Sequence, residues 1–296
     1  MDSPMKKVFY QQRADFIKES TDRNSTLNMP DGITELTDIS YIADETPEHR
    51  LDIYRPSGFE DKVLPVIINI HGGGLIIGNK EFNRYFCGLL CKKGYMVYSV
   101  EYRLIPDCRV YDQFYDIQRA FDFIKNDIPS RCGDADRIYS VADSGGAYLL
   151  AYCAAMLGNR RVAKAAHVKP SDIKLNSIAL ISGMFYTTRF DKIGLFLPRF
   201  LYGAGWRKSS FAKYVKPSHK DIVSALPPSL FITSRKDNLR KYTLDFYKAA
   251  SAYSDKHILL DYNKDERLTH AFSVFHPFMD ESIEVIDKIN EFFMQY

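Results

Sequence analysis

Short apolar runs that alternate with helical patterns constrain the fold of this chain more than any other feature. Seven runs have the length and composition of β-strands, at 49–56, 63–70, 95–102, 137–142, 177–182, 229–234 and 257–262. Apolar residues at helical spacing lie between them, at about 81–93, 113–128, 145–157, 239–253 and 280–294. This alternation predicts βαβ units, and hence an α/β fold with a mainly parallel central sheet covered by helices on both faces.

Two segments depart from this rhythm. The first forty residues are polar with scattered aromatic residues, and we expect helix and loop outside the main core. Residues 184 to about 225 hold many aromatic residues and no clear strand, which predicts a helical insertion after a strand. The 296 residues are enough to build a large core without disulfide bonds or metals.

Candidate functional residues follow four of the predicted strands. Ligands of open parallel sheets bind beyond the carboxyl ends of the strands, so residues at these positions are the first to consider. The four strand ends carry, in chain order, His71-Gly72-Gly73-Gly74, Asp143-Ser144-Gly145-Gly146, Asp237 and His270. Together they offer backbone donors, a hydroxyl, a carboxylate and an imidazole.

Each of these residues also has an ordinary structural explanation. A Ser before a helix is a common N-cap, and a loop Asp is usually solvated. His276 is a rival to His270, but its Phe and Pro neighbours favour a packing role. The chain order Ser144, Asp237, His270 matches the nucleophile, acid and base of α/β-hydrolases. We therefore predict that Ser144 is a nucleophile activated by His270, which Asp237 orients.

Small residues around Ser144 support this interpretation. A nucleophile on a sharp strand-to-helix turn brings the residues two before and two after it into close contact, and these are Ala142 and Gly146. The glycine run at 72–74 allows backbone N–H groups to approach a substrate oxygen closely. We expect His71 to form structural hydrogen bonds rather than to act in catalysis.

These motifs resemble the hormone-sensitive-lipase-like branch of the α/β-hydrolase esterases, from about residue 50 to the C-terminus. The resemblance rests on HGGG at 71–74, EYRLIP at 101–106, ADSGGA at 142–147, SRKDNL at 234–239 and THAF at 269–272. It implies an α/β-hydrolase catalytic domain over 46–296 and a helical cap formed by residues 1–45 and the insertion at 184–225. It also implies structural roles for Tyr102 and Arg103.

The chain departs from the family pattern at the nucleophile and at the acid. Family members usually read Gly-Asp-Ser-Ala-Gly-Gly, whereas Ala142 and Ala147 stand at the two ends of the motif here. A second aspartate usually follows the acid motif, where this chain has Arg240. Neither change removes a catalytic group.

The resemblance implies a serine carboxylesterase that cleaves short- to medium-chain acyl esters through an acyl-enzyme. The backbone N–H groups of Gly73, Gly74 and Gly145 are the expected oxyanion-hole donors, and no metal or organic cofactor is required. The expected partner is a small apolar ester. We expect most aromatic residues of the insertion to attach the cap to the sheet, and some to line the entrance; they are Phe185, Tyr186, Phe190, Phe196, Phe200, Tyr202 and Trp206.

Two alternatives remain open from sequence. An amidase or formamidase of the same fold would use the same three side chains. A non-catalytic protein that binds a small apolar ligand on this scaffold usually lacks the Ser or the His, and both are present here.

Charge and composition exclude other classes of function. The net charge is +3 and no run of five or more basic residues occurs, so nucleic-acid binding has no support. The five cysteines form no CxxC pair, as expected for reduced thiols in the cytoplasm. We see no signal peptide and no apolar run of about 18 residues, so we expect no membrane span. A homodimer is a candidate assembly.

Overall fold

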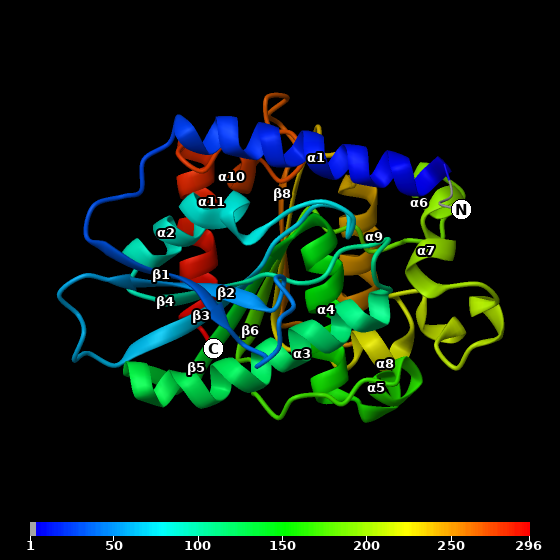
Figure 1. Ribbon diagram of the computed structural model, residues 1–296, viewed down its shortest axis with the longest axis horizontal. Coiled ribbons are helices and arrows are strands. Elements are labelled where there is room, and N and C mark those ends of the chain that lie inside the picture. The colour runs from blue at the N-terminus through cyan, green and yellow to red at the C-terminus, as the bar shows by residue number, and fades with distance from the viewer. Residues whose placement is uncertain (1–3) are drawn as a thin grey trace.

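The computed structural model describes residues 4–296 and contains an eight-stranded sheet (Figure 1). The order of the strands across the sheet is β1-β2-β4-β3-β5-β6-β7-β8. Strand β2 pairs antiparallel with both β1 and β4, and all other neighbours are parallel. The strands are β1 (Ile33–Ser40), β2 (Arg50–Pro56), β3 (Leu64–Ile70), β4 (Met96–Val100), β5 (Gly133–Asp143), β6 (Ser177–Ile181), β7 (Ser229–Ser234) and β8 (His257–Tyr262).

Helices cover both faces of this sheet, and α1 crosses above one edge of it (Figure 1). The α-helices are α1 (Pro4–Ser25), α2 (Arg84–Lys92), α3 (Val110–Asp127), α4 (Ser144–Gly158), α5 (Arg160–Ala166), α6 (Lys192–Phe196), α7 (Pro198–Tyr202), α8 (Lys220–Val223), α9 (Arg240–Ser251), α10 (Phe272–Phe275) and α11 (Asp280–Phe293). Short 3₁₀ helices lie at η1 (Lys80–Asn83), η2 (Ile128–Arg131), η3 (Trp206–Lys208) and η4 (Ala212–Tyr214). The predicted alternation of strands and helices is confirmed.

The apolar side chains of the strands pack into two hydrophobic clusters, one on each face of the sheet. In β3, Val66 and Ile68 join the cluster that contains α3 and α4, whereas Ile67 joins the cluster that contains α2 and α11. Because successive side chains of a strand point to opposite faces, a strand buried on both faces reads as a continuous apolar run. This is why the central strands could be recognised in the sequence.

The N-terminal segment differs from the expectation of helix and loop outside the core. Residues 33–40 form β1, which pairs with β2 and adds an edge strand to the sheet. Its residues are only partly buried, so the strand lacks the apolar run that marks the others. The expected cap segment 1–45 is therefore divided: α1 lies across the top of the molecule, and β1 belongs to the sheet.

The segment between β6 and β7 contains only short helices among its described elements, α6, α7, η3, η4 and α8. Its helical character agrees with the predicted insertion. In the part of the chain from 4 to 296, no helix has both the length and the apolar character needed to cross a membrane.

Candidate active site

Ser144 occupies a sharp turn between β5 and α4. Its φ angle is 50°, in the left-handed region that non-glycine residues seldom adopt. A Cβ atom at Gly146 would lie 2.3 Å from the carbonyl oxygens of both Ile70 and His71, so this position accepts only glycine without movement of the backbone. The turn thus holds the Ser144 side chain at the carboxyl end of the sheet, where the nucleophile was predicted.

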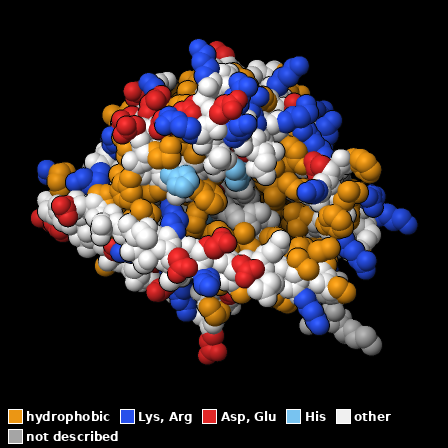
Figure 2. Space-filling view, turned by 90° about the horizontal axis from the view of Figure 1, so that it is seen from above, with side chains coloured by type: hydrophobic (Ala, Val, Ile, Leu, Met, Phe, Trp, Pro, Cys, Tyr) orange, Lys and Arg blue, Asp and Glu red, His pale blue; other side chains and the backbone are white. Residues whose placement is uncertain are grey.

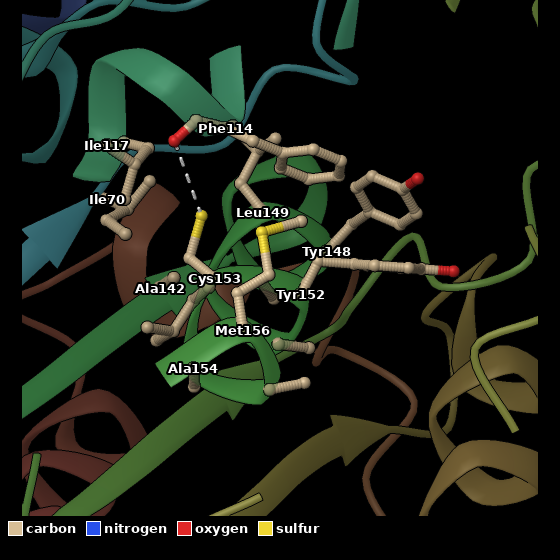
Figure 3. Packing of buried hydrophobic residues seen from close by; sticks show 14 of the residues in the cluster. Ile70, Phe114, Ile117, Ala142, Tyr148, Leu149, Tyr152, Cys153, Ala154 and Met156 are labelled. Carbon is tan, nitrogen blue, oxygen red and sulfur yellow. Dashed lines mark hydrogen bonds between the residues drawn. The ribbon is translucent and has the colours of Figure 1, made fainter. Parts of the chain in front are cut away.

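The two alanines that depart from the family pattern are accommodated in the core. Ala142 and Ala147 are both buried and belong to the cluster under α4. Figure 3 shows Ala142 beneath this helix, near Cys153. The methyl group of Ala142 therefore contributes to packing.

Three polar side chains form one hydrogen-bonded row. His270 Nε2 lies 3.0 Å from Ser144 Oγ, and His270 Nδ1 lies 2.7 Å from Asp237 Oδ1. An ionised carboxylate can only accept, so Nδ1 donates to Asp237 and Nε2 is left to accept the Ser144 proton. His276, the rival, is exposed and lies outside this row. The structure brings the three predicted residues together, and their catalytic roles remain predictions.

Asp237 is held by two further donors at the end of β7. The Thr233 hydroxyl donates to Oδ2 at 2.7 Å, and the Leu239 N–H donates to Oδ1 at 2.8 Å. Burial alone would raise the pKa of Asp237, but the hydrogen bond and positive charge of His270, with these two donors, lower it below its ordinary value. The side chain is fully buried, so an ionised carboxylate faces one ring nitrogen of His270.

The loop that carries His270 is fixed by its neighbours. Lys236 and Thr269 form a parallel bridge, which aligns the residues that follow β7 and β8. The Ala271 N–H donates to Ser182 Oγ at 3.0 Å. Ser182 follows β6 and was not predicted, although a hydroxyl directly after a buried strand was the available signal.

The glycine run folds back against the nucleophile turn. Gly73 and Gly74 have φ angles of 110° and 60°, and the N–H groups of Ile76 and Ile77 donate to the Gly73 carbonyl. The nitrogen of Gly74 lies 3.0 Å from where a Cβ of Gly145 would stand. The three glycines predicted to form the oxyanion hole therefore lie close together beside Ser144, and their role stays a prediction.

Buried polar side chains hold the glycine run 72–74 in place. Asp143 Oδ1 accepts from the Gly72 N–H and from Asn83 Nδ2, both at 3.0 Å. Burial raises the pKa of Asp143, although these donors oppose the rise. The carboxylate thus ties the residue before the nucleophile to the start of the glycine run.

His71 has the structural surroundings expected of it. Its Nε2 lies 2.8 Å from Glu101 Oε1, and the Tyr102 hydroxyl donates to its carbonyl at 2.8 Å. Burial alone would lower the pKa of His71, but the charge and hydrogen bond of Glu101 raise it. Arg103, the other residue expected to be structural, pairs with the buried Asp116 at 2.6 Å.

A cavity of about 630 Å³ opens above Ser144 and His270. One wall of the cavity is formed by α1 residues at helical spacing. Figure 2 shows the molecule from above, with His side chains beside a central hollow. The lining residues comprise Gln12, Asp15, Phe16, Glu19 and Arg23 from α1, the run His71–Asn79 without Leu75, and Phe82, Asn83, Asp143, Ser144, His270 and Phe275.

The expected contribution of the insertion to this entrance is wrong. None of its seven named aromatic residues lines the cavity within the described part of the chain. Phe185, Tyr186 and Tyr202 are buried in the core, and Phe200 packs edge-on against Phe9 at 5.0 Å. The wall expected from the insertion is instead supplied by α1.

Arg23 anchors α1 at this wall. Its guanidinium donates to the carbonyls of Phe82, Val274 and Phe275 at 2.7–3.0 Å. Burial lowers the pKa of Arg23 to about 10. Carbonyl acceptors are neutral, so Arg23 keeps its positive charge, and α1 presents to the cavity this cation and the exposed carboxylates of Asp15 and Glu19.

Comparison with known proteins places the chain in a family. The family model described as BD-FAE matches residues 51–242. The chain belongs to the BD-FAE family. The matched region contains the glycine run, Ser144 and Asp237, whereas α1 and His270 lie outside it. The cavity of this BD-FAE member thus combines a matched core with a wall from beyond the match.

Curated relatives are similar over shorter stretches. A probable isoprenylcysteine alpha-carbonyl methylesterase of Oryza sativa subsp. japonica is 34% identical over 112 residues, which are 38% of this chain and 26% of that protein. A versiconal hemiacetal acetate esterase of Dothistroma septosporum is 31% identical over 98 residues, 33% of this chain and 30% of that protein. The chain spans less than half of the length of the curated relatives it matches.

Solved structures establish the fold. Esterase B from Lactobacillus rhamnosis superposes with a TM-score of 0.91 at 22% identity, over 98% of this chain and 94% of that one. An esterase from Pyrobaculum calidifontis gives a TM-score of 0.72 at 23% identity, over 99% and 91%. The predicted α/β-hydrolase fold of this BD-FAE family member is confirmed.

No candidate metal centre accompanies this site. Among residues 4–296, no group of three or more His, Cys, Asp or Glu side chains could hold a metal ion. All five cysteines are free thiols, and burial raises the pKa of Cys87 and Cys153. A thiol held protonated is a poor nucleophile, and no cysteine of the described residues lines the cavity above Ser144 and His270.

Proposed function

We propose that this protein is a serine carboxylesterase that hydrolyses short- to medium-chain acyl esters through an acyl-enzyme. The observation that carries the proposal is the row Ser144–His270–Asp237, of which Ser144 and His270 line a cavity, with the glycine run beside it. The curated relatives support it, because their names describe a methylesterase and an acetate esterase.

In the proposed reaction, His270 Nε2 takes the proton of the Ser144 hydroxyl as Oγ attacks the ester carbonyl. Asp237 holds the Nδ1–H tautomer and stabilises the imidazolium that forms. The negative charge that develops on the carbonyl oxygen is met by the N–H groups of Gly73, Gly74 and Gly145. Each such donor contributes about 3 kcal/mol to the transition state.

The second half of the reaction repeats these roles with water. His270 gives its proton to the departing alcohol, which completes acylation of Ser144. It then removes a proton from the water that attacks the acyl-enzyme, and passes this proton to Ser144 Oγ as the bond to the acyl group breaks and the acid leaves. Gly145 is the second residue of α4, so the positive end of the helix dipole also faces the oxyanion. Every proton transfer uses the same imidazole.

The cavity supports a substrate of limited size. Its volume of about 630 Å³ lies within the range of small-molecule sites. Ile76, Ile77 and Phe82 provide apolar surface for an acyl chain, and the carboxylates of Asp15 and Glu19 disfavour a negatively charged substrate. We infer a preference for neutral or cationic esters of short or medium chain, with α1 acting as the cap over them.

The test compares wild type with Ser144→Ala on p-nitrophenyl acetate, butyrate and decanoate. We expect wild type to favour the shorter chains, and the variant to lose at least about 10³-fold in turnover. Melting temperatures of both proteins control for folding. Turnover by wild type that does not exceed that of the variant would refute the proposal.

Two further measurements separate the alternatives. A fluorophosphonate should phosphonylate wild type with loss of fluoride, and so add the mass of its phosphonyl group to wild type and not to Ser144→Ala, which identifies the reactive hydroxyl. A matched pair of butyryl ester and butyryl anilide then distinguishes an esterase from an amidase. Faster cleavage of the anilide would assign the same site to amide hydrolysis.

A further inference from the structure

The insertion exposes large apolar side chains close together in the sequence. Phe190 is 94% exposed, Leu195 is 57% exposed and Phe196 is 55% exposed. All three lie within or just before α6, a helix with no buried residue. Exposed apolar groups of this kind on a folded protein mark interaction surfaces.

The segment around α6 lies next to α1, the helix that forms one wall of the cavity. In Figure 1, α6 and α7 lie at the right of the molecule, next to the start of α1. In Figure 2, hydrophobic side chains gather to the right of the central hollow, and Lys and Arg side chains surround them at the outer rim. A surface that contacted this region would therefore lie near the entrance of the cavity.

The insertion is also strongly basic. Residues 184–216 contain seven Lys and Arg against one Asp, a net charge of +6, whereas the whole chain carries only +3. The single acid, Asp191, already accepts from the Gly194 N–H and the Tyr242 hydroxyl. Lys192 and Arg199 are exposed and form no ion pair with the described residues. Their charges are free to meet an anionic partner.

A shallow groove extends this basic character to α1. Lys6, Arg109 and Arg199 line a groove of about 450 Å³ together with Phe200. Two carboxylates also line it. Asp107 pairs with Arg13 at 2.8 Å, and Asp112 accepts from the Arg109 N–H at 2.8 Å. The Asp112 contact is to the backbone of Arg109, and none of the three cationic side chains forms an ion pair within 4.0 Å among the described residues, although the charge of Lys6 contributes to lowering the pKa of Asp107.

We propose that the α6–α7 segment and the start of α1 dock on an anionic lipid surface. Phe190, Leu195 and Phe196 enter the interfacial layer, while Lys192 and Arg199 contact lipid phosphates. A second copy of this chain is a poorer partner, because a symmetric interface would place two segments of charge +6 against each other. This inference does not depend on the proposed reaction.

The experiment measures cosedimentation of the full chain with vesicles. One set is phosphatidylcholine alone, and the other contains about one third phosphatidylserine. We expect wild type to bind the anionic vesicles, and binding to weaken as salt is raised. Absence of binding, or equal binding to both sets without salt dependence, would overturn the proposal.

Two variants and a matched control assign the surface. F190S/L195S/F196S removes the apolar side chains, and K192E/R199E reverses two charges. Each should bind anionic vesicles at least about tenfold more weakly. The control V63S/M294S removes two apolar side chains that are 61% and 68% exposed elsewhere, and should bind as wild type does. Variants that bind like wild type would refute the assignment.

Turnover of soluble p-nitrophenyl butyrate separates this proposal from the proposed reaction. Both surface variants should retain wild-type turnover. Wild type without turnover that still binds vesicles would refute the reaction and leave the docking surface intact. A dimer by light scattering that F190S/L195S/F196S dissociates, without vesicle binding by wild type, would identify a self-association surface and overturn lipid docking.

Discussion

Gly146→Ala should impair the proposed catalysis through a steric clash alone. The added Cβ would lie 2.3 Å from two carbonyl oxygens, those of Ile70 and His71. Contacts of this kind below 3.0 Å essentially never occur, so the start of α4 must move from β3 by about 0.7 Å, the difference between the two distances. Both obstacles are backbone atoms and cannot rotate away. Overpacking of this type costs about 1–3 kcal/mol of stability.

The same shift displaces the nucleophile. Ser144 lies two residues from the substitution, and its Oγ is 3.0 Å from His270 Nε2. A displacement of nearly 1 Å costs about 10²-fold in rate when it separates reacting groups. We therefore expect Gly146→Ala to lose about 10²-fold in kcat/KM for p-nitrophenyl butyrate, and to unfold at lower urea concentration.

A second glycine provides the control. Gly58 has a φ of 77° but nothing within 4 Å of its Cβ position, so Gly58→Ala introduces backbone strain without a clash. It should cost about 1 kcal/mol in urea unfolding and leave kcat/KM unchanged. The reasoning is refuted if Gly146→Ala keeps kcat/KM within about threefold of wild type, because the clash would then not reach the nucleophile.

Three further predictions concern the proposed acid and the cavity wall. Asp237→Asn should lower kcat by about 10³–10⁴-fold with little change in melting temperature, because an amide favours the wrong tautomer of the imidazole; a loss below tenfold contradicts an orienting role. Thr233→Val removes a donor that lowers the pKa of Asp237, so this pKa rises towards its ordinary value. The stability that the ionised carboxylate contributes is present above about pH 4 and is lost on acidification. Circular dichroism should therefore show acid unfolding of Thr233→Val at higher pH than wild type, and an unchanged midpoint would exclude this contribution. Asp15→Asn/Glu19→Gln should reduce kcat/KM for butyrylcholine by about three- to tenfold relative to its neutral 3,3-dimethylbutyl analogue; an unchanged ratio would show that α1 does not select charge.

The central sheet and the positions of the polar row could be predicted because local sequence carries their signals. Strands buried on both faces are continuous apolar runs, and Ser144 directly follows such a run. Asp237 lies three residues beyond the end of β7, and His270 lies in the longer loop after the partly buried β8. The chain order Ser144, Asp237, His270 matches that of the nucleophile, acid and base in α/β-hydrolases, and this match predicts that these three side chains lie together. Neither step requires knowledge of distant contacts.

The cavity wall could not be predicted, because its contacts are distant in sequence. Only Phe9 and Ser20 of α1 are buried, so this helix has no apolar stripe from which its packing face could be predicted. Its attachment depends on Arg23, which contacts carbonyls 59 to 252 residues away. Strand β1 was missed for a related reason, since a partly exposed edge strand has no apolar run. Aromatic composition likewise could not distinguish the buried Phe185 from the exposed Phe190.

The division of the cavity between two parts of the chain has a consequence for how substrate choice can change. The groups that would perform acyl transfer stand on the sheet, whereas Gln12, Asp15, Phe16 and Glu19 stand on a separate helix outside the family match. We expect exchange of these four side chains to alter which esters enter the cavity without touching the proposed reacting groups. Evolution of new ester preferences, or their redesign in the laboratory, can therefore proceed on α1 alone while the acylation apparatus stays constant.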